Sequence, residues 1–444
     1  MLFGTIRSRL AALGVIASAA LLGHTARGQD AITTPAPPTT TNQPPVALDF
    51  QPAAILTGLR LGPFDIQPRV TTGVTYDDNI LISSRKPESD LIWSMQPAFL
   101  AVAGDRLATE DYQRTYHNVV NFSPDTFIIT EPENWPGKTL MVDYGPKFNW
   151  FTEHTENDSI DEFLTINALW PMGKMILGFR QEYALQDTTI IEAGRRTWEQ
   201  TIPTVLMAGY QFSEKTTAEI NLTRNSVSYE QQQGLADSTD WCWENWLNYQ
   251  YSPRLNLSVG ANLGILDLPS QPGQTYETPM VRARYCYGTR IILDGSVGEQ
   301  LRQYEGGIPS TAKPVFKLTG FYQAAETTSL SLSCFRSELP SVGYSYDYIM
   351  TGMSLAMWQQ FGERYFMTLS FGYYNGDYLA TMQSAAATAQ ASRTDSYVAV
   401  TPGLEIRFTR HLIGNLFYQF RNLESKQSNG WTENQVGTRL TWSF

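Results

Sequence analysis

The stretch Arg254–Ile265, which reads RLNLSVGANLGI, changes polarity at every residue. From Leu255 onward its odd-numbered positions are apolar, and the positions between them hold Asn, Ser or Gly. A period of two is typical of a β-strand with one apolar and one polar face. The same alternation recurs in Thr139–Phe151, Tyr365–Tyr373 and Gln435–Phe444. The sequence therefore predicts an all-β protein.

The composition narrows the environment of these strands. Charged residues make up 17% of the 444 residues, below the usual ~25%, and aromatic residues make up 12%. The alternating segments are often 12 or more residues long, whereas soluble strands average ~5–6 residues and tilted membrane strands need ~9–11. The formal net charge of −11 argues against nucleic acid as a partner. These features favour a transmembrane β-barrel with a hydrated lumen.

The connections between the alternating segments differ in length in a regular way. Short connections alternate with long polar ones, as they do in outer-membrane barrels, which have short periplasmic turns and long outer loops. The short connections are Pro171–Lys174, Phe212–Lys215, Ser252–Arg254, Tyr287–Arg290, Phe361–Arg364 and Thr409–His411. The expected long ones are Gln186–Arg196, Glu230–Asp240, Leu268–Tyr276, Tyr304–Lys313, Tyr374–Thr394 and Asn422–Gly430.

The length of the alternating region predicts the number of strands. At roughly 21 residues per strand and its share of loop, residues 63–444 give an up-and-down antiparallel barrel of ~18 strands, with 16 as the alternative. Residues 104–138 fall where a short turn is due. That segment is either a periplasmic insertion or a hidden hairpin.

The first 62 residues lie outside the predicted barrel. Arg7 and Arg9 precede an apolar stretch, and small residues precede Gln29, so residues 1–28 are predicted to be a secretory signal peptide. Its removal would take three positive charges from the net −11 and leave −14. Residues 29–62 are rich in Pro and Thr and are predicted to be a linker.

The last strand ends with outward aromatic residues at Trp442 and Phe444. This ending resembles the C-terminal signal by which bacterial outer-membrane proteins reach the barrel assembly machinery. The protein is thus predicted to lie in outer-membrane lipid and to have that machinery as a partner.

A motif near the start of the barrel adds a family resemblance. Val70–Ile80, which ends in Tyr-Asp-Asp-Asn-Ile, is followed by Ser89-Asp90 and then by Gln96–Phe99. The arrangement resembles a family of outer-membrane β-barrel porins, some of whose members sit in exopolysaccharide-export operons. The resemblance covers about thirty residues and implies a barrel of porin type, without a substrate or a functional residue.

Charged residues on the polar faces are the candidates for lining the lumen, because lumen charges tune the selectivity of a barrel. They are Asp143, Lys147, Arg282, Arg284 and Arg439. The alternative is that they pair with lumen acids and only fill space. The net negative charge predicts a mild preference for cations in an open pore.

Other chemistry-bearing residues support no catalytic or metal site. His154 lies among acids in a predicted outer loop, where barrel enzymes place a general base, but a solvated loop is favoured. Asp77, Asp78, Asn79 and Asp90 offer oxygen ligands, but an Asx-type turn is favoured. Three unpaired thiols are expected, at Cys242, Cys286 and Cys334. We predict no cofactor and no enzymatic activity.

The leading functional prediction is passive passage of small polar solutes or saccharides. Two alternatives stay open. One is a closed structural barrel associated with exopolysaccharide export and plugged by a long loop such as Tyr374–Thr394. The other is a barrel enzyme at the outer rim; a soluble periplasmic sandwich is weaker still. The sequence leaves the oligomeric state open, with a homotrimer as one alternative.

Overall fold

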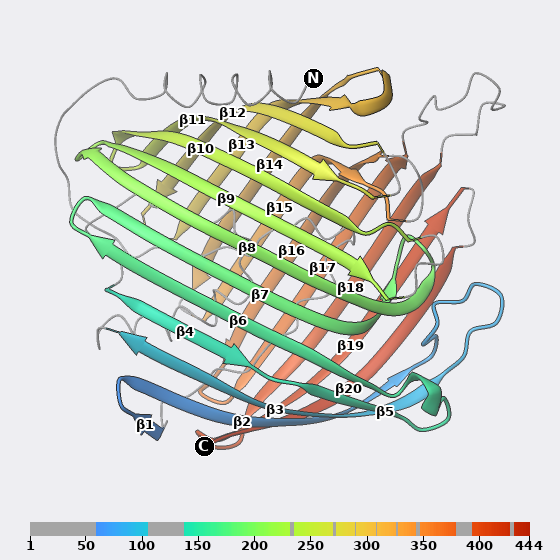
Figure 1. Ribbon diagram of the computed structural model, residues 1–444. Coiled ribbons are helices and arrows are strands. Elements are labelled where there is room, and N and C mark those ends of the chain that lie inside the picture. Colours follow the sequence, from blue (N-terminus) through green and yellow to red (C-terminus); the bar gives the residue numbers. More distant parts are fainter. Residues whose placement is uncertain are drawn as a thin grey trace.

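The computed structural model describes residues 59–104, 137–230, 235–269, 272–288, 290–307, 309–325, 327–342, 347–378, 393–426 and 430–444. The predicted signal peptide, most of the predicted linker, and residues 105–136 and 379–392 lie outside this part. The described residues form one antiparallel sheet and two short 3-10 helices, η3 and η4 (Figure 1). The elements are β1 (Leu59–Leu61), β2 (Phe64–Asp77), β3 (Asp90–Gly104), β4 (Thr139–Tyr144), β5 (Lys147–Phe151), η3 (Thr155–Asn157), β6 (Ser159–Met172), β7 (Met175–Ile190), β8 (Arg195–Ser213), β9 (Thr216–Tyr229), β10 (Ser238–Ser252), β11 (Leu255–Asp267), β12 (Gln274–Tyr287), β13 (Ile291–Tyr304), η4 (Glu305–Gly307), β14 (Thr311–Ala325), β15 (Thr328–Pro340), β16 (Asp347–Phe361), β17 (Tyr365–Tyr378), β18 (Thr394–Arg407), β19 (Leu412–Ser425) and β20 (Trp431–Ser443).

The sheet closes into a barrel because its first long strand pairs with its last. In this seam β2 pairs with β20 from Arg69↔Ser443 to Asp77↔Gln435. β4 and β5 are two halves of one strand, since both lie between β3 and β6. The break falls at Gly145-Pro146, where proline has no N–H for the ladder. The ring therefore has 18 strands, as the sequence predicted, with the short β1 added beside the start of β2.

Strand positions follow the alternation closely. The alternating segments Arg254–Ile265 and Tyr365–Tyr373 match β11 and β17, with only Arg254 falling one residue outside its strand. The strands are 13 to 19 residues long, apart from β1 and the two half-strands. The short connections are confirmed. The start of β2 and the end of β20 lie at the same end of the barrel as the short turns (Figure 1).

Two predicted boundaries are wrong. The long polar loop expected at Gln186–Arg196 is a four-residue turn, because Asp187–Ile190 and Arg195–Trp198 continue the β7–β8 ladder. β1 lies within the range predicted as linker, where Leu59 pairs with Ile66.

The two faces of the barrel are chemically distinct. Val259, Val281 and Leu293 point outward and are about half exposed, whereas inward neighbours such as Ser258 and Arg282 are buried. Aromatic side chains line the outside at the short-turn end and again at the loop end. They include Tyr251, Tyr287, Phe361, Phe408, Trp442 and Phe444 at one end, and Tyr76, Trp93, Trp150, Trp241 and Trp243 at the other. None of the helices in the described part of the chain is both long and apolar enough to span a bilayer.

Candidate functional site

The inner wall of the barrel carries the charged residues singled out in the sequence. Asp143, Lys147, Arg282, Arg284 and Arg439 all lie on the inward-facing side of their strands, as shown by their outward neighbours. A charged residue that faces the lumen does not by that fact control which ions pass. If it is paired with an opposite charge, it contributes little to the electric field in the lumen. Their partners therefore decide what they can do.

Arg282 belongs to a buried network that extends over four adjacent strands. Its guanidinium lies 3.1 Å from the Glu219 carboxylate, donates to Asn248 Oδ1 at 2.8 Å, and stacks over the Trp246 ring at 4.3 Å. Asn248 in turn donates to Glu219 at 2.9 Å and accepts from Ser258 at 2.6 Å. Such a paired and hydrogen-bonded charge is stable away from bulk water.

Three of the other candidates lie elsewhere on the wall. Asp143 on β4 pairs with Arg69 on β2 at 2.9 Å, with both side chains about nine-tenths buried. Lys147 on β5 lies opposite Asp161 of β6 in the register. Arg439 stacks over the Phe417 ring at 4.8 Å. Arg284 lies two residues from Arg282 on the inward face of β12, and Asp143 and Lys147 lie on the two halves of one strand. The structure thus groups four of the five candidates in two pairs and does not gather all five into one site.

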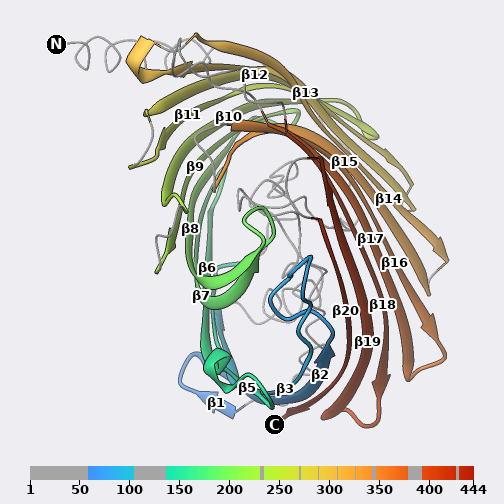
Figure 2. The ribbon, with the colours of Figure 1, turned by 90° about the vertical axis from the view of Figure 1, so that its right-hand side faces the viewer.

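The turn between β7 and β8 (residues 191–194) bends into the lumen and reaches the opposite wall (Figure 2). The Glu192 carboxylate accepts hydrogen bonds from the Ser341 hydroxyl and from the Val342 N–H, the latter at 3.1 Å. Arg393 donates to the Glu192 carbonyl oxygen at 3.2 Å and bonds to Asp395 at 2.9 Å. All five residues are buried or nearly so. We call this crossing the β7–β8 crossbar.

The loop between β2 and β3 (residues 78–89) also folds inward (Figure 2). The Asn79 side chain donates to the Thr432 carbonyl oxygen at 2.8 Å. It also donates to the Ser83 carbonyl oxygen and accepts a hydrogen bond from the Ser83 N–H. These contacts hold Ile82 at a φ of +47°, a left-handed conformation that a β-branched residue rarely adopts. Ile80 and Ile82 are almost fully buried.

The two inward loops meet the far wall in one apolar cluster, which we call the mouth cluster. Ile82 from the β2–β3 loop and Ile191 from the crossbar pack with buried side chains of β15–β20. The wall residues are Phe335, Tyr348, Met350, Tyr374, Tyr378, Tyr397, Ala399, Leu423 and Trp431. The cluster narrows the lumen at the loop end of the barrel.

The sequence prediction missed the mouth cluster. The available signal was the presence of apolar residues where polar loops were expected, at Ile80–Ile82 and at Ile190-Ile191. An inward-folding loop that must pack against a wall requires such residues, whereas a solvated outer loop does not.

The four oxygen-bearing residues near the start of the barrel bind protein donors. Asp77 accepts the Asn79 N–H at 2.8 Å, which confirms the Asx-type turn. The Asp78 carboxylate accepts hydrogen bonds from the backbone N–H and the side-chain amide of Asn434 on β20. Within the described ranges, no group of three or more His, Cys, Asp or Glu residues could hold a metal ion. Within the described part of the chain, Cys242, Cys286 and Cys334 form no disulfide, as predicted.

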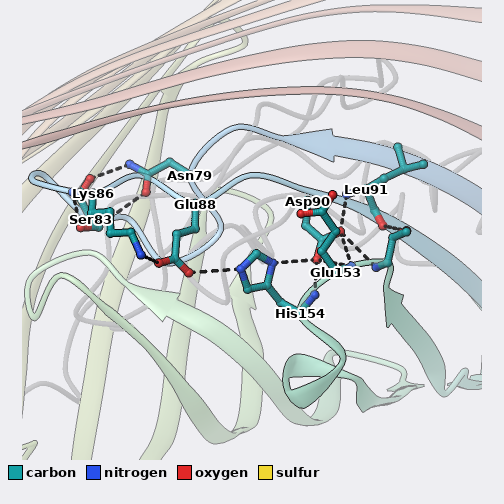
Figure 3. A network of polar contacts seen from close by, with 9 residues as sticks. Asn79, Ser83, Lys86, Glu88, Asp90, Leu91, Glu153 and His154 are labelled. Carbon is teal, nitrogen blue, oxygen red and sulfur yellow. Dashed lines mark hydrogen bonds and ion pairs between the residues drawn. The ribbon is translucent and has the colours of Figure 1, made fainter.

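His154, the candidate base, lies between two carboxylates at the loop end (Figure 3). Its Nδ1 is 3.1 Å from Asp90 Oδ2 and its Nε2 is 3.1 Å from Glu88 Oε2. Asp90 also accepts the backbone N–H groups of Thr152, Glu153 and His154 itself. Both ring nitrogens thus face carboxylates, an arrangement that suits an ion-pair link between loops better than a nucleophile's base.

The predicted assembly signal is placed on the outer face. Trp442 and Phe444 are both more than half exposed, and their rings stack at 5.9 Å. The Phe444 N–H donates to the Pro68 carbonyl oxygen at 3.0 Å, which extends the seam. Recognition by the assembly machinery stays a prediction.

Comparison with known proteins finds similarity in fold alone. Acinetobacter baumannii OccAB4 is 12% identical, with 85% of this chain and 98% of that chain covered and a TM-score of 0.45. Pseudomonas aeruginosa OpdO is 12% identical, with 86% and 97% covered and a TM-score of 0.45. P. aeruginosa OpdK, solved with vanillate, is 10% identical, with 86% and 99% covered and a TM-score of 0.42. These similarities are too distant to assign a role to any residue of this chain.

No family model matches the sequence, and no curated protein matches it. The resemblance of Val70–Phe99 to the porin family, and the link to exopolysaccharide export, therefore stay predictions.

Proposed function

We propose that this protein is an outer-membrane channel through which small polar solutes pass without chemical change. The observation that carries the proposal is the closed 18-strand ring with an apolar, aromatic-edged outside and a polar inside. A ring of this size encloses an aqueous lumen unless loops fill it. The apolar band on its outside suits the hydrocarbon core of a bilayer. The aromatic rings at the two edges of the band suit the two membrane–water interfaces.

The inner wall supports selection by size and hydrogen bonding rather than by charge. Arg69 with Asp143, and Arg282 with Glu219, show cations that are paired with acids close by. A paired cation and acid present a dipole, together with hydrogen-bond donors and acceptors, to the lumen. Such groups suit hydroxyl-rich or zwitterionic solutes. Only a mild preference for cations is expected from the overall negative charge.

The second candidate is a barrel that is closed at rest. The mouth cluster favours it, because Ile82 and Ile191 place apolar side chains across the loop end. A narrow apolar passage resists wetting and so resists ions. The two candidates differ in one measurable quantity, which is the conductance of the unmodified protein.

The test is single-channel recording of the full chain, purified in detergent from the outer-membrane fraction of a diderm host. Stepwise conductance of the unmodified protein supports the open channel. If the unmodified protein is silent and Glu192→Ala conducts, the barrel is closed at rest. Recovery in the soluble fraction, or silence of both proteins after insertion, would overturn the proposed channel.

A further inference from the structure

The β2–β3 loop is held at both of its limbs, but the two anchors differ in chemistry. Its first limb is fixed to β20 by hydrogen bonds from Asn79 to the Thr432 carbonyl oxygen and from Asn434 to the Asp78 carboxylate. Its second limb reaches the β5–β6 loop through Glu88 and His154 (Figure 3). The second anchor depends on an imidazole, a group that changes charge near neutral pH.

Two acceptors on one imidazole require two protons. A neutral histidine has a single N–H and can donate to Asp90 or to Glu88, but not to both. The observed geometry, with 3.1 Å at each nitrogen, is therefore that of the charged imidazolium. Consistently, the hydrogen bond that His154 donates to Asp90 raises the pKa of His154 above its ordinary value of 6.5, with Glu88 and Glu156 adding to the effect.

Of the two carboxylates, Glu88 is the one that would be released. Asp90 is fixed by backbone N–H groups of residues 152–154, and its side chain is fully buried. Glu88 belongs to the loop and is more exposed. Its other cationic partner, Lys86 at 3.1 Å, lies on the same loop and gives no anchor to the rest of the barrel.

Glu88 is connected directly to the part of the loop that narrows the lumen. The Ile80 N–H donates to the Glu88 carbonyl oxygen at 2.9 Å. Two residues further on, the Ile82 N–H bonds to the Asn79 carbonyl oxygen at 2.9 Å, and Ile82 packs in the mouth cluster. The strained backbone at Ile82 favours departure from this position once the limb is free.

We propose that His154 and Glu88 form a proton-dependent latch that keeps the β2–β3 loop, and with it Ile82, inside the lumen. The latch rests on the proposed channel function and adds regulation to it. The sign follows from the raised pKa of His154. The ion pair that anchors the β2–β3 loop to His154 is fully formed when the pH lies below the ordinary imidazole pKa. It is lost as the pH rises through the higher pKa that His154 has in the folded protein. The lumen therefore opens on the alkaline side.

The surrounding charges are consistent with this direction. His154 faces Asp90 from β3, Glu88 from the β2–β3 loop and Glu156 from η3, and Lys86 lies beyond Glu88. Three acids against one cation stabilise the imidazolium.

The test combines a loop probe with conductance. A nitroxide is attached at the exposed loop residue Ser84 through Ser84→Cys, with Cys242, Cys286 and Cys334 replaced by serine. Its mobility is followed by electron paramagnetic resonance from about pH 5 to about pH 9, a range that spans a histidine titration. Mean conductance of the unlabelled protein is followed over the same range.

The latch predicts an immobile label and low conductance at acid pH, with both rising together as His154 loses its proton. His154→Gln and Glu88→Gln should give a mobile label and the higher conductance at every pH. The matched control is His411→Gln, since His411 lies in a short turn beside the Ser443 carbonyl oxygen at the other end of the barrel. It should behave as the parent protein.

Label mobility that is independent of pH would overturn the latch even if the protein conducts. Label mobility that changes with pH, in a protein that never conducts, would support the latch and overturn the proposed channel. The two proposals thus fail separately.

Discussion

The crossbar and the β2–β3 loop both enter the lumen, but they are held there by different physics. Glu192 and Arg393 are buried, and their partners include backbone groups and a hydroxyl of the opposite wall. Glu88 and His154 are partly exposed and depend on a single titrating ring. Buried hydrogen bonds are costly to break at any pH, whereas a partly exposed ion pair is weak and conditional. The barrel thus has one permanent obstruction and one conditional obstruction.

The largest effect is expected from breaking the crossbar. Glu192→Ala leaves the Ser341 hydroxyl and the Val342 N–H without their acceptor, at about 1–3 kcal/mol for each buried donor. The turn should leave the opposite wall, and the single-channel conductance should rise at all pH values. The control is Glu363→Ala in an exposed short turn. An unchanged conductance, with unchanged amide exchange at residues 190–194, would contradict the crossbar.

An intermediate effect is expected at Ile82. Ile82→Ala removes a buried side chain from the mouth cluster, a change that costs about 2–5 kcal/mol where the cavity stays open. Ile82→Gly loses the same contacts but removes the steric strain of the left-handed backbone, and this relief is worth roughly 1 kcal/mol. The glycine variant should therefore hold the loop more firmly than the alanine variant, against the usual order. Amide exchange at residues 82 and 83 of the two variants measures the difference, and the opposite order would refute the strain.

A smaller effect is expected when the fixed side of the latch is changed. Asp90→Asn removes the charge that contributes most to raising the pKa of His154. The pKa should fall toward 6.5, and the opening of the loop should shift to lower pH. Imidazole NMR titration in micelles gives the pKa directly. Asp78→Asn, which alters a contact to Asn434 instead, should leave it unchanged.

The smallest effect is expected at Lys86. This side chain is 85% exposed, so its pairing with Glu88 is screened by solvent and salt. Lys86→Ala removes a cation near the imidazolium and should raise the pKa of His154 slightly at low ionic strength. The shift should vanish in high salt. A large shift that persists in salt would mean that Lys86 is part of the latch.

The barrel could be predicted from sequence because the alternation within each strand shows which of its residues face outward and which face the lumen. In Arg254–Ile265 every second residue is apolar, and the strand length and the alternating loop lengths then give the architecture and the count. The inward placement of Arg282 and Arg439 follows from the same parity. None of these inferences needs knowledge of a distant residue.

The contents of the lumen could not be predicted in this way. The partners of Glu192 are 149 and 150 residues away, and no local pattern encodes a contact across the barrel. The expected loop at Gln186–Arg196 shows the same limit, since its polar residues continue the ladder and then cross the lumen. His154 was singled out for its acidic neighbours in sequence, yet its main partners Glu88 and Asp90 come from another loop and strand.

The seam between β2 and β20 has a consequence for biogenesis. Gly73 pairs with Arg439, so this ladder joins residues that lie far apart in the chain. Until that ladder forms, the sheet has two open edges, and open edges recruit other strands. Closure over such a separation is also slow. Refolding yield should therefore fall steeply with protein concentration, and holding β2 and β20 together early should protect the chain from aggregation.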